Sequence, residues 1–327
     1  MIQDRWLKEL SYDPIDLLIN SNNSSIEYFT RRDLLDEDVV EVDCLWELPI
    51  PKKLISKQKE DGSWKYPGRK GKLRSSEDYN QLETFRQLGE LVEKYGFKRK
   101  HPSIKMAAEY LFKCQSEEGD FRGIYGNQYS TTYTGAIMEL LIKIGYIKDA
   151  RIEKGFKWLI TKRQNDGGWA IPFRTLNMKY TDALKLPDLL QSDPSKPSSH
   201  LITGMVLRTF AAHPIYRNTT EAHQAGKLLM TRFFKRDKYT DRQDKKYWES
   251  VSYPFWFTDI VTSLDSLYYL GFGRKEPHIS SALNWLVKKQ EPNGTFNLKL
   301  LRTRDKNLKY WVTLVVCRIF KKYFSKI

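Results

Sequence analysis

The chain has 327 residues, of which 40% are hydrophobic and 13% aromatic, a composition that excludes a disordered chain and supplies a large core. The net charge of +15 indicates one of two things. Either the protein has a polyanionic partner, such as nucleic acid, an acidic membrane face or a diphosphate-bearing substrate, or its surface is simply rich in solvated lysine.

Targeting and metal signals are absent from the sequence. No run approaches the roughly 18 apolar residues that a membrane span needs, and the first ten residues lack the layout of a signal peptide. Cys44, Cys114 and Cys317 lie far apart, which favours reduced thiols over disulfides or a zinc site. We therefore expect a cytoplasmic protein that holds no metal and no cofactor.

Residues 1–45 are predicted to form a helical N-terminal extension to a main domain over residues 46–327. Asp13 and Pro14 suit a helix start, and Ser24 and Glu27 have the spacing of a capping box at a second start. This helix pair is expected to plug or flank one end of the main body.

Four segments share one pattern, in which an apolar helical run ends at a glutamine followed by polar residues, glycine and an aromatic residue. They are Gln58–Trp64, Gln115–Phe121, Gln164–Trp169 and Gln290–Phe296. The first two intervals between the glutamines are 57 and 49 residues, whereas the last is 126, or about two repeats. A worn copy is therefore expected midway, over residues 225–248.

A second predicted helix follows each turn, with a polar start and an apolar body. These helices begin near Tyr79, Ser130, Ser199, Thr258 and Leu308. No segment alternates as a half-buried strand does over more than a few residues, so the fold class is all-α. Because a two-helix repeat cannot bury its apolar face alone, neighbouring repeats must stack.

The glutamine turns resemble the QW repeat of the terpenoid cyclase and protein prenyltransferase superfamily, with squalene-hopene cyclase as the nearest type. The resemblance covers about residues 46–327 and implies an α/α toroid, a barrel with an inner and an outer ring of helices. It also implies that the turns are structural and tie one outer helix to the next. The residues concerned are Gln58 with Trp64, Gln115 with Phe121, Gln164 with Trp169 and Gln290 with Phe296.

Polar residues at the starts of the inner helices are expected to face a central cavity at one mouth of the ring. The candidate ligand-binding residues are Tyr79, Tyr129, Tyr133, Arg208, Trp256, Lys309 and Tyr310. Threonines recur slightly further along these helices, at positions that favour packing within the inner ring. They are Thr84, Thr134, Thr203, Thr262 and Thr313.

The candidate catalytic residues are Asp259, Asp265 and His200. A buried acid among aromatic residues can protonate an alkene or act as a base once burial raises its pKa. Asp259 equally suits the first turn of a helix, and a lone histidine is more often structural. Arg208, within an apolar helix, needs an anionic ligand or a carboxylate, and Asp265 is one candidate partner.

The catalytic motifs of the resembled enzymes are missing. The chain has neither the D-x-D-D acid motif of substrate-protonating cyclases nor the zinc ligands of prenyltransferases. Two other segments attract attention. The loop over residues 65–74 is rich in cations and suits a phosphate or an RNA backbone, although it is more typical of a solvated loop, and the insertion over residues 174–199 is long enough for a lid.

Three functions remain open. The preferred hypothesis is a protein that binds an apolar or isoprenoid-like small molecule, with or without a phosphate group, in an aromatic-lined central cavity. The second is a cyclase-like or prenyltransferase-like enzyme with a single aspartic acid. The third is a scaffold that binds nucleic acid or protein through its basic surface, and peripheral contact with an acidic membrane is a further possibility.

Overall fold

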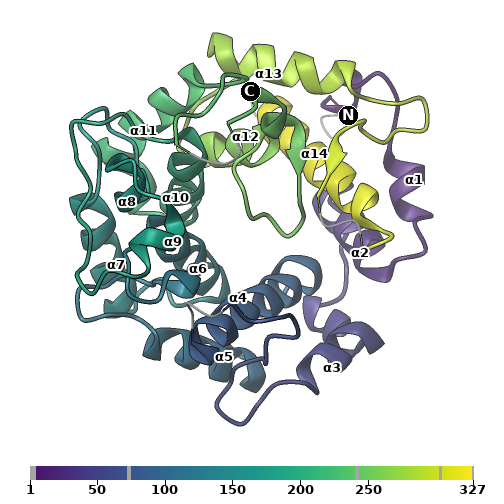
Figure 1. The fold of residues 1–327 in the computed structure, drawn as a ribbon. Coiled ribbons are helices and arrows are strands. Elements are labelled where there is room, and N and C mark those ends of the chain that lie inside the picture. Colours follow the sequence, from purple (N-terminus) through teal and green to yellow (C-terminus); the bar gives the residue numbers. More distant parts are fainter. Residues whose placement is uncertain (1–4, 72–74, 240–242, 302–303, 326–327) are drawn as a thin grey trace.

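The computed structural model describes residues 5–71, 75–239, 243–301 and 304–325. Helices are arranged in two concentric layers around a central axis (Figure 1). The inner helices are α4 (Ser76–Tyr95), α6 (Thr131–Ile144), α10 (His200–Ala212), α12 (Ile260–Tyr269) and α14 (Leu308–Phe324). The outer helices are α3 (Pro49–Ile55), α5 (Pro102–Lys113), α7 (Ala150–Thr161), α11 (Thr220–Thr231) and α13 (Pro277–Lys288). The predicted all-α toroid is confirmed.

Short elements complete the chain. The 3-10 helices are η1 (Leu7–Glu9), η2 (Val42–Glu47), η3 (Gly123–Tyr125), η4 (Tyr216–Asn218) and η5 (Lys245–Glu249). The strands β1 (Ser250–Val251) and β2 (Lys299–Leu300) pair in parallel, and the insertion contains α8 (Pro172–Thr175) and α9 (Tyr180–Ala183). In the described part of the chain, no helix combines the length and the apolarity that crossing a membrane requires.

Four of the five inner helices begin at a side-chain cap, whereas α14 begins after Asn307, whose side chain makes no capping bond. Ser75 and Asp78 form a capping box at the start of α4, and Ser130 and Ser199 cap α6 and α10. Glycines in the left-handed conformation end α4 and α6. Because an outer helix returns the chain between consecutive inner helices, each inner helix starts at the same mouth of the ring and finishes at the other.

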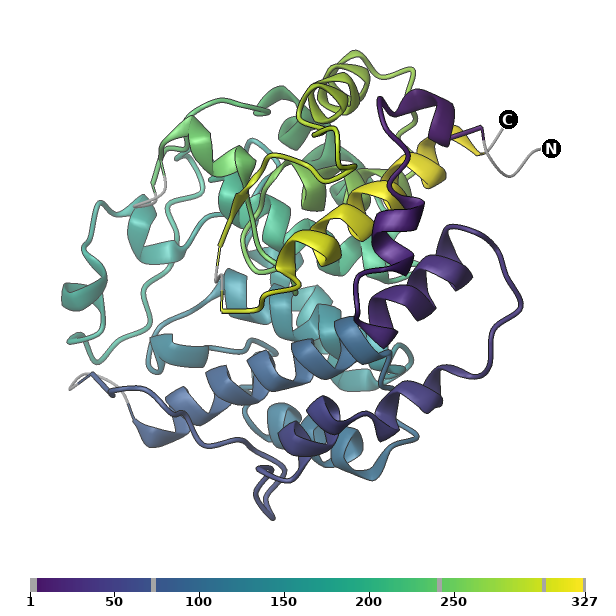
Figure 2. The same ribbon diagram turned by 90° about the vertical axis from the view of Figure 1, so that its right-hand side faces the viewer.

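The N-terminal helices α1 (Ile15–Ile19) and α2 (Ser24–Asp33) lie beside α14 (Figures 1 and 2). Helix α2 contacts both α14 and α4, which are the last and first of the inner helices. The predicted cap of this helix is wrong by one residue, because Asn23 accepts the backbone N–H groups of Ser25 and Ile26. The division of the chain at residue 45 stays a prediction.

Each glutamine of the repeat lies at the end of an outer helix and bonds backbone on both sides of the turn. In the first two repeats its amide donates to the glycine carbonyl of its own turn and to a carbonyl at the start of the next outer helix. The pairs of acceptors are Gly62 and Ser103 for Gln58, and Gly119 and Arg151 for Gln115. Gln164 instead reaches Asp193 and Lys196, so the insertion takes the place of an outer helix there.

The aromatic residue of each turn links the outer layer to the inner one. The indole of Trp169 donates to the Leu159 carbonyl of α7 at 2.7 Å, while its backbone N–H donates to the Thr203 hydroxyl of α10 at 3.0 Å. Trp64 makes the same two bonds, to Leu54 and Thr84. In three repeats, therefore, a threonine of the inner helix holds the turn, since Thr134 receives the N–H of Phe121 in the same way.

The degenerate fourth repeat has the tryptophan of the pattern but lacks the glutamine. Trp248 is buried and its indole donates to the Lys235 carbonyl at 2.9 Å, just after the end of α11. Its ring contacts Phe233 and Phe234. The polar insertion between Lys235 and Trp248 thus lengthens the turn without moving the aromatic residue out of the core.

Candidate functional site

The segment between β1 and α12, residues 252–259, projects into the ring (Figure 1). Tyr253 is anchored there, since its hydroxyl donates to the Glu93 carbonyl at 2.8 Å and its ring stacks on Trp311 with centroids 5.4 Å apart. Tyr253 and Phe255 line two cavities, one on each side of this segment. The central segment therefore divides the interior of the ring between the two mouths.

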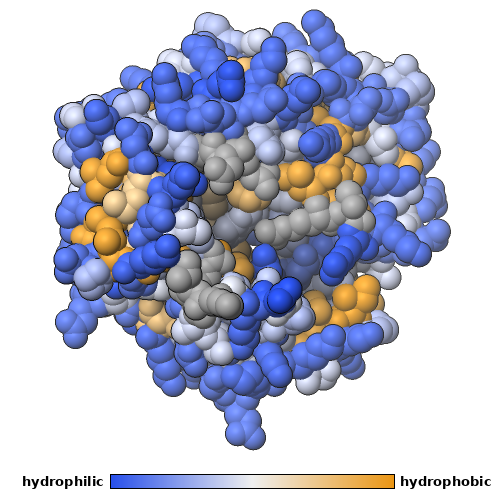
Figure 3. Space-filling model, viewed as in Figure 1, coloured by the Kyte–Doolittle hydropathy of each residue, from blue (hydrophilic) through white to orange (hydrophobic). Residues whose placement is uncertain are grey.

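The first of these, which we call the aromatic cavity, has a volume of about 800 Å³. Six aromatic side chains line it, namely Phe85, Tyr95, Tyr253, Phe255, Trp256 and Trp311. The rings of Phe85 and Trp256 contact each other with centroids 5.1 Å apart. Figure 3 shows the face of the molecule hollowed at the centre of the ring. The volume and the mostly apolar walls suit a small organic ligand.

Carboxylates outnumber cations in the aromatic cavity. Glu83, Glu90, Glu93, Glu139 and Asp305 face three cations, which are Arg86, Lys94 and Arg304. Lys94 bonds both Glu90 at 2.7 Å and Asp305 at 2.8 Å. Lys143 and Arg208, which lie behind the wall, pair with Glu93 and Glu139, so the cavity has no excess of positive charge. Its π faces favour an uncharged or cationic occupant over an anionic one.

A row of alternating charges runs behind the aromatic wall. Lys143 bonds Glu93 at 2.6 Å and Glu139 at 2.7 Å, and Glu139 bonds Arg208 at 2.9 Å. Burial alone would raise the pKa of Glu139, but Arg208 and Lys143 hold this pKa below its usual value. The suggestion that Arg208 pairs with Asp265 is wrong, because the carboxylate beside it is that of Glu139.

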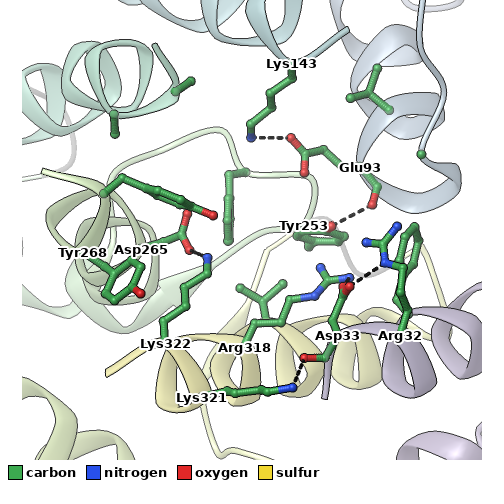
Figure 4. A pocket seen from close by; sticks show the side chains of 18 of the residues that line it. Arg32, Asp33, Glu93, Lys143, Tyr253, Asp265, Tyr268, Arg318, Lys321 and Lys322 are labelled. Atoms are coloured by element: carbon green, nitrogen blue, oxygen red, sulfur yellow. Dashed lines mark hydrogen bonds and ion pairs between the residues drawn. The ribbon is translucent and has the colours of Figure 1, made fainter. Parts of the chain in front are cut away.

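The second cavity, which we call the cationic cavity, has a volume of about 830 Å³ and lies between the C-terminal halves of the inner helices and α2. Asp265 lines it and bonds Lys322 of α14 at 2.6 Å (Figure 4). This predicted catalytic residue is therefore placed at the opposite end of the ring from Trp256, which lines the aromatic cavity.

Asp259 is the N-cap of α12 and is buried. Its carboxylate accepts the Thr262 N–H at 2.8 Å, and the Thr262 hydroxyl accepts the Asp259 N–H at 2.9 Å. Burial raises the pKa of Asp259 to about 7, although the bonds from Thr262 and the charge of Arg208 oppose this rise in pKa. Asp259 is absent from the residues that line either cavity in the described part of the chain.

His200, the first residue of α10, is buried away from both cavities. Its Nε2 lies 3.6 Å from the Asp237 carboxylate, and its ring packs on Trp248 with centroids 4.6 Å apart. Burial lowers the pKa of His200, while Asp237 acts in the opposite direction on that pKa. Asp237 also accepts the Ser199 hydroxyl, so this pair belongs to the start of the helix.

The predicted tyrosines do not form one group. The Tyr79 hydroxyl accepts the Gly71 N–H at 2.7 Å, at the edge of the basic loop whose residues 72–74 lie outside the described chain. Tyr129 bonds Glu118 at 2.7 Å, on the outer side. Tyr133 contacts a lining residue of the aromatic cavity, with its ring centroid 5.4 Å from that of Trp256.

The last two predicted ligand residues are neighbours at the start of α14. Lys309 is exposed, and its amino group lies 4.8 Å from the centre of the Tyr310 ring, which is half-buried. Neither residue lines the aromatic or the cationic cavity within the described chain. Of the predicted positions, Trp256 alone lines the aromatic cavity, and Arg208 supports its wall from behind.

Several lining residues escaped the sequence reasoning, including Phe85, Glu93, Glu139 and Trp311. A signal did exist for Glu139, which is a charge in the middle of an otherwise apolar stretch of helix, and the same signal singled out Arg208. The sequence carries no such signal for the aromatic residues, because an aromatic side chain that lines a cavity and one that packs in the core have the same helical spacing.

Comparisons with known proteins agree with the repeat. The family model of the squalene-hopene cyclase C-terminal domain matches residues 77–183, about a third of the chain. A terpene cyclase-glycosyl transferase fusion protein from Humicola fuscoatra is 26% identical over 238 residues, which cover 71% of this chain and 16% of that protein. These matches confirm the predicted resemblance to the terpenoid cyclase superfamily.

Two solved structures are similar at low sequence identity. A variant of the type II terpene cyclase MstE from Scytonema, bound to geranylgeranyl dihydroxybenzoate, is 13% identical, with 87% of this chain and 97% of that one covered and a TM-score of 0.40. A polysaccharide lyase is 11% identical, with 96% and 98% covered and a TM-score of 0.47. Both TM-scores are below 0.5 and the two proteins differ in activity, so neither defines a ligand for this chain.

Proposed function

We propose that this protein binds an apolar, isoprenoid-like small molecule in the aromatic cavity. The observation that carries the proposal is the set of six aromatic side chains around about 800 Å³ of interior space. Such walls gain free energy by removing hydrocarbon from water, roughly 25 cal/mol for each Å² of apolar surface buried. Because each of the lining residues Glu93 and Glu139 is already paired with a cation and the lining has no excess of positive charge, the preferred ligand carries no phosphate in this cavity.

A glycine on the cavity wall provides a direct test. Gly89 lies within α4, and a Cβ placed on it meets only the side chains of Leu140 at 3.7 Å and Pro254 at 3.8 Å, which are ordinary contacts. Gly89→Phe therefore places a ring into the cavity from a helical position that accepts side chains. Gly273→Phe is the matched control, because Gly273 is exposed and a Cβ there meets nothing within 4 Å.

The measurement is calorimetric titration with uncharged C15 and C20 isoprenoid alcohols. The native protein and Gly273→Phe should bind saturably, whereas Gly89→Phe should bind about tenfold more weakly or worse, with its far-UV circular dichroism unchanged. Equal binding by both variants, or no saturable binding by the native protein, would contradict the proposal.

Acid-catalysed cyclisation is the second candidate function. It is favoured by Asp259, a buried acid whose pKa of about 7 leaves it partly protonated at neutral pH, and by π faces that stabilise positive charge. Asp259 lies three residues beyond Trp256, so the central segment would have to shift for a substrate to reach it. Incubation of C15 and C20 isoprenoids with the native protein and with Asp259→Asn tests this candidate, since cyclic products should form with the first only.

A further inference from the structure

We propose that the cationic cavity is a separate binding site for an organic phosphate, preferably one that carries a diphosphate or two phosphate groups. This proposal is independent of the function assigned to the aromatic cavity, because the two cavities lie on opposite sides of the central segment. It rests on the charge inventory of the walls, on how those charges are paired, and on the apolar surface between them.

The walls carry more positive than negative charge. Cations from five parts of the chain line the cavity, and carboxylates are fewer. The seven cations are Arg32, Lys98, Lys143, Arg217, Arg318, Lys321 and Lys322, and the four carboxylates are Asp33, Asp36, Glu93 and Asp265. The excess is therefore three positive charges inside one cavity of about 830 Å³.

All four carboxylates are already engaged. Figure 4 shows Asp265 with Lys322, Glu93 with Lys143, and Asp33 with Arg32. Arg318 also bonds Asp33, and Lys321 bonds Asp36 at 2.6 Å. Each anion in the wall thus has at least one cation, so none of them compensates the remaining positive charge.

Lys98 and Arg217 account for much of the excess. Among the described residues neither forms an ion pair, and the Lys98 amino group donates only to the backbone carbonyl of Lys143, at 2.7 Å. Both lie just beyond inner helices, after the C-cap of α4 and within η4 after α10. Lys98 is exposed, and the Lys143 carbonyl that it contacts lies in the last turn of α6, where a cation suits the helix dipole. Arg217 is half-buried and its side chain makes no such bond among the described residues, so its charge is the one that the surrounding protein leaves without a partner.

The cavity also offers apolar surface for the rest of the ligand. Phe29, Tyr253, Phe255, Tyr268 and Val315 lie among the charged residues. In Figure 4, Lys143 enters from one side, while Lys322 and Arg318 enter from the opposite side, with Tyr253 between them. Cations on facing walls and aromatic rings between them suit a phosphate group with an attached organic part.

The size of the charge excess selects the chemistry. A phosphate monoester carries about −1.5 to −2 charges at pH 7, so a diphosphate or a bisphosphate matches three positive charges better than a single phosphate or a carboxylate does. The aromatic cavity has no such excess of positive charge, because Lys143 and Arg208 are paired with its Glu93 and Glu139, and so it does not favour the same group. The two ends of the ring are therefore matched to ligands of different charge.

The test uses the full-length protein and inorganic pyrophosphate as the probe, with binding measured by calorimetry at constant ionic strength. Lys98→Gln, Arg217→Gln removes two charges from the cavity without breaking an ion pair between described residues. Lys105→Gln, Lys113→Gln removes two charges from exposed positions on α5 and is the control for net charge.

Pyrophosphate should bind saturably to the native protein and to the α5 control, and about tenfold or more weakly to the cavity variant. An isoprenoid diphosphate that binds more tightly than pyrophosphate would support the proposal, because it would show that the aromatic side chains of the cationic cavity contribute to binding. Equal weakening in both double variants would show that only net charge matters, and absence of saturable binding would also overturn the proposal. Gly89→Phe should leave pyrophosphate binding unchanged, which separates this site from the aromatic cavity.

Discussion

Asp259 caps a helix and also remains an acid that can give up a proton near neutral pH. As N-cap of α12 it receives the Thr262 N–H, which would favour its ionised form. Burial outweighs this bond and raises the pKa of Asp259 to about 7. The two readings of this position from sequence, acid and cap, therefore describe the same side chain.

The pKa of Asp259 predicts a pH-dependent stability. In the unfolded chain the group ionises near pH 4, whereas in the folded protein it keeps its proton up to about pH 7. The folded state binds more protons between these values, so Asp259 lowers the free energy of unfolding as pH rises from about 4 to 7. Asp259→Asn, which keeps a capping oxygen, removes this loss.

We therefore expect Asp259→Asn to gain stability relative to the native protein between pH 4 and 7, by an amount on the order of 4 kcal/mol, and to gain nothing more above that range. Urea unfolding at several pH values measures the difference. A difference that does not change with pH would mean that the folded-state pKa of Asp259 is near its usual value.

At the scale of elements, the repeat is a three-part clamp. A glutamine joins two outer helices, an aromatic residue packs between layers, and a threonine hydroxyl of the inner helix receives the N–H of that aromatic residue. The glutamine and the aromatic residue are visible in the turn itself. The threonine belongs to the clamp although it lies 13 residues later in the second complete copy.

Removing one glutamine should measure the strength of a clamp. Gln115→Ala removes the bonds to the Gly119 and Arg151 carbonyls, which are 2.8 and 2.9 Å long, and should lower the free energy of unfolding by about 2 kcal/mol. Glu117→Ala, an exposed position in the same turn, should change it by less than about 0.5 kcal/mol. Chemical denaturation decides the matter, and similar losses in both variants would argue against the clamp.

At the scale of the whole molecule, the two ends of the chain meet. Gln290, the glutamine of the last turn, accepts the N–H groups of Ser11 and Tyr12 and donates to the Tyr12 carbonyl at 2.7 Å. Helix α2 then contacts both α14 and α4. We propose that the N-terminal helix pair closes the ring, in the place that the next repeat would occupy.

If so, breaking the last clamp should loosen the N-terminal segment before the rest of the ring. In hydrogen exchange, Gln290→Ala should speed exchange over residues 11–19, while α6 and α10 keep their protection. Lys288→Ala, exposed on the same outer helix, is the control. Uniformly faster exchange throughout the chain would instead indicate a global loss of stability.

The sequence by itself determined the architecture. Glutamine, glycine and aromatic residues recur at near-regular intervals, and helices with one apolar face must stack, so the layers of the ring follow from local chemistry and periodicity. The same reasoning named Trp256 as a residue at the start of an inner helix that faces the interior of the ring. It also identified Arg208 as a charge that needs a partner.

Only the tertiary structure decided what lies inside the ring. The partner of Arg208 is Glu139, 69 positions earlier, and Asp265 faces the opposite mouth from Trp256. Both outcomes depend on the rotation of each helix about its axis and on the path of the central segment. Neither the rotation nor the path can be deduced from the periodicity of the sequence. Periodicity indicates which face of a helix is buried, but a cavity wall and a packed core are buried alike. The two cavities and the difference in charge between them therefore become visible only when the helices are placed together.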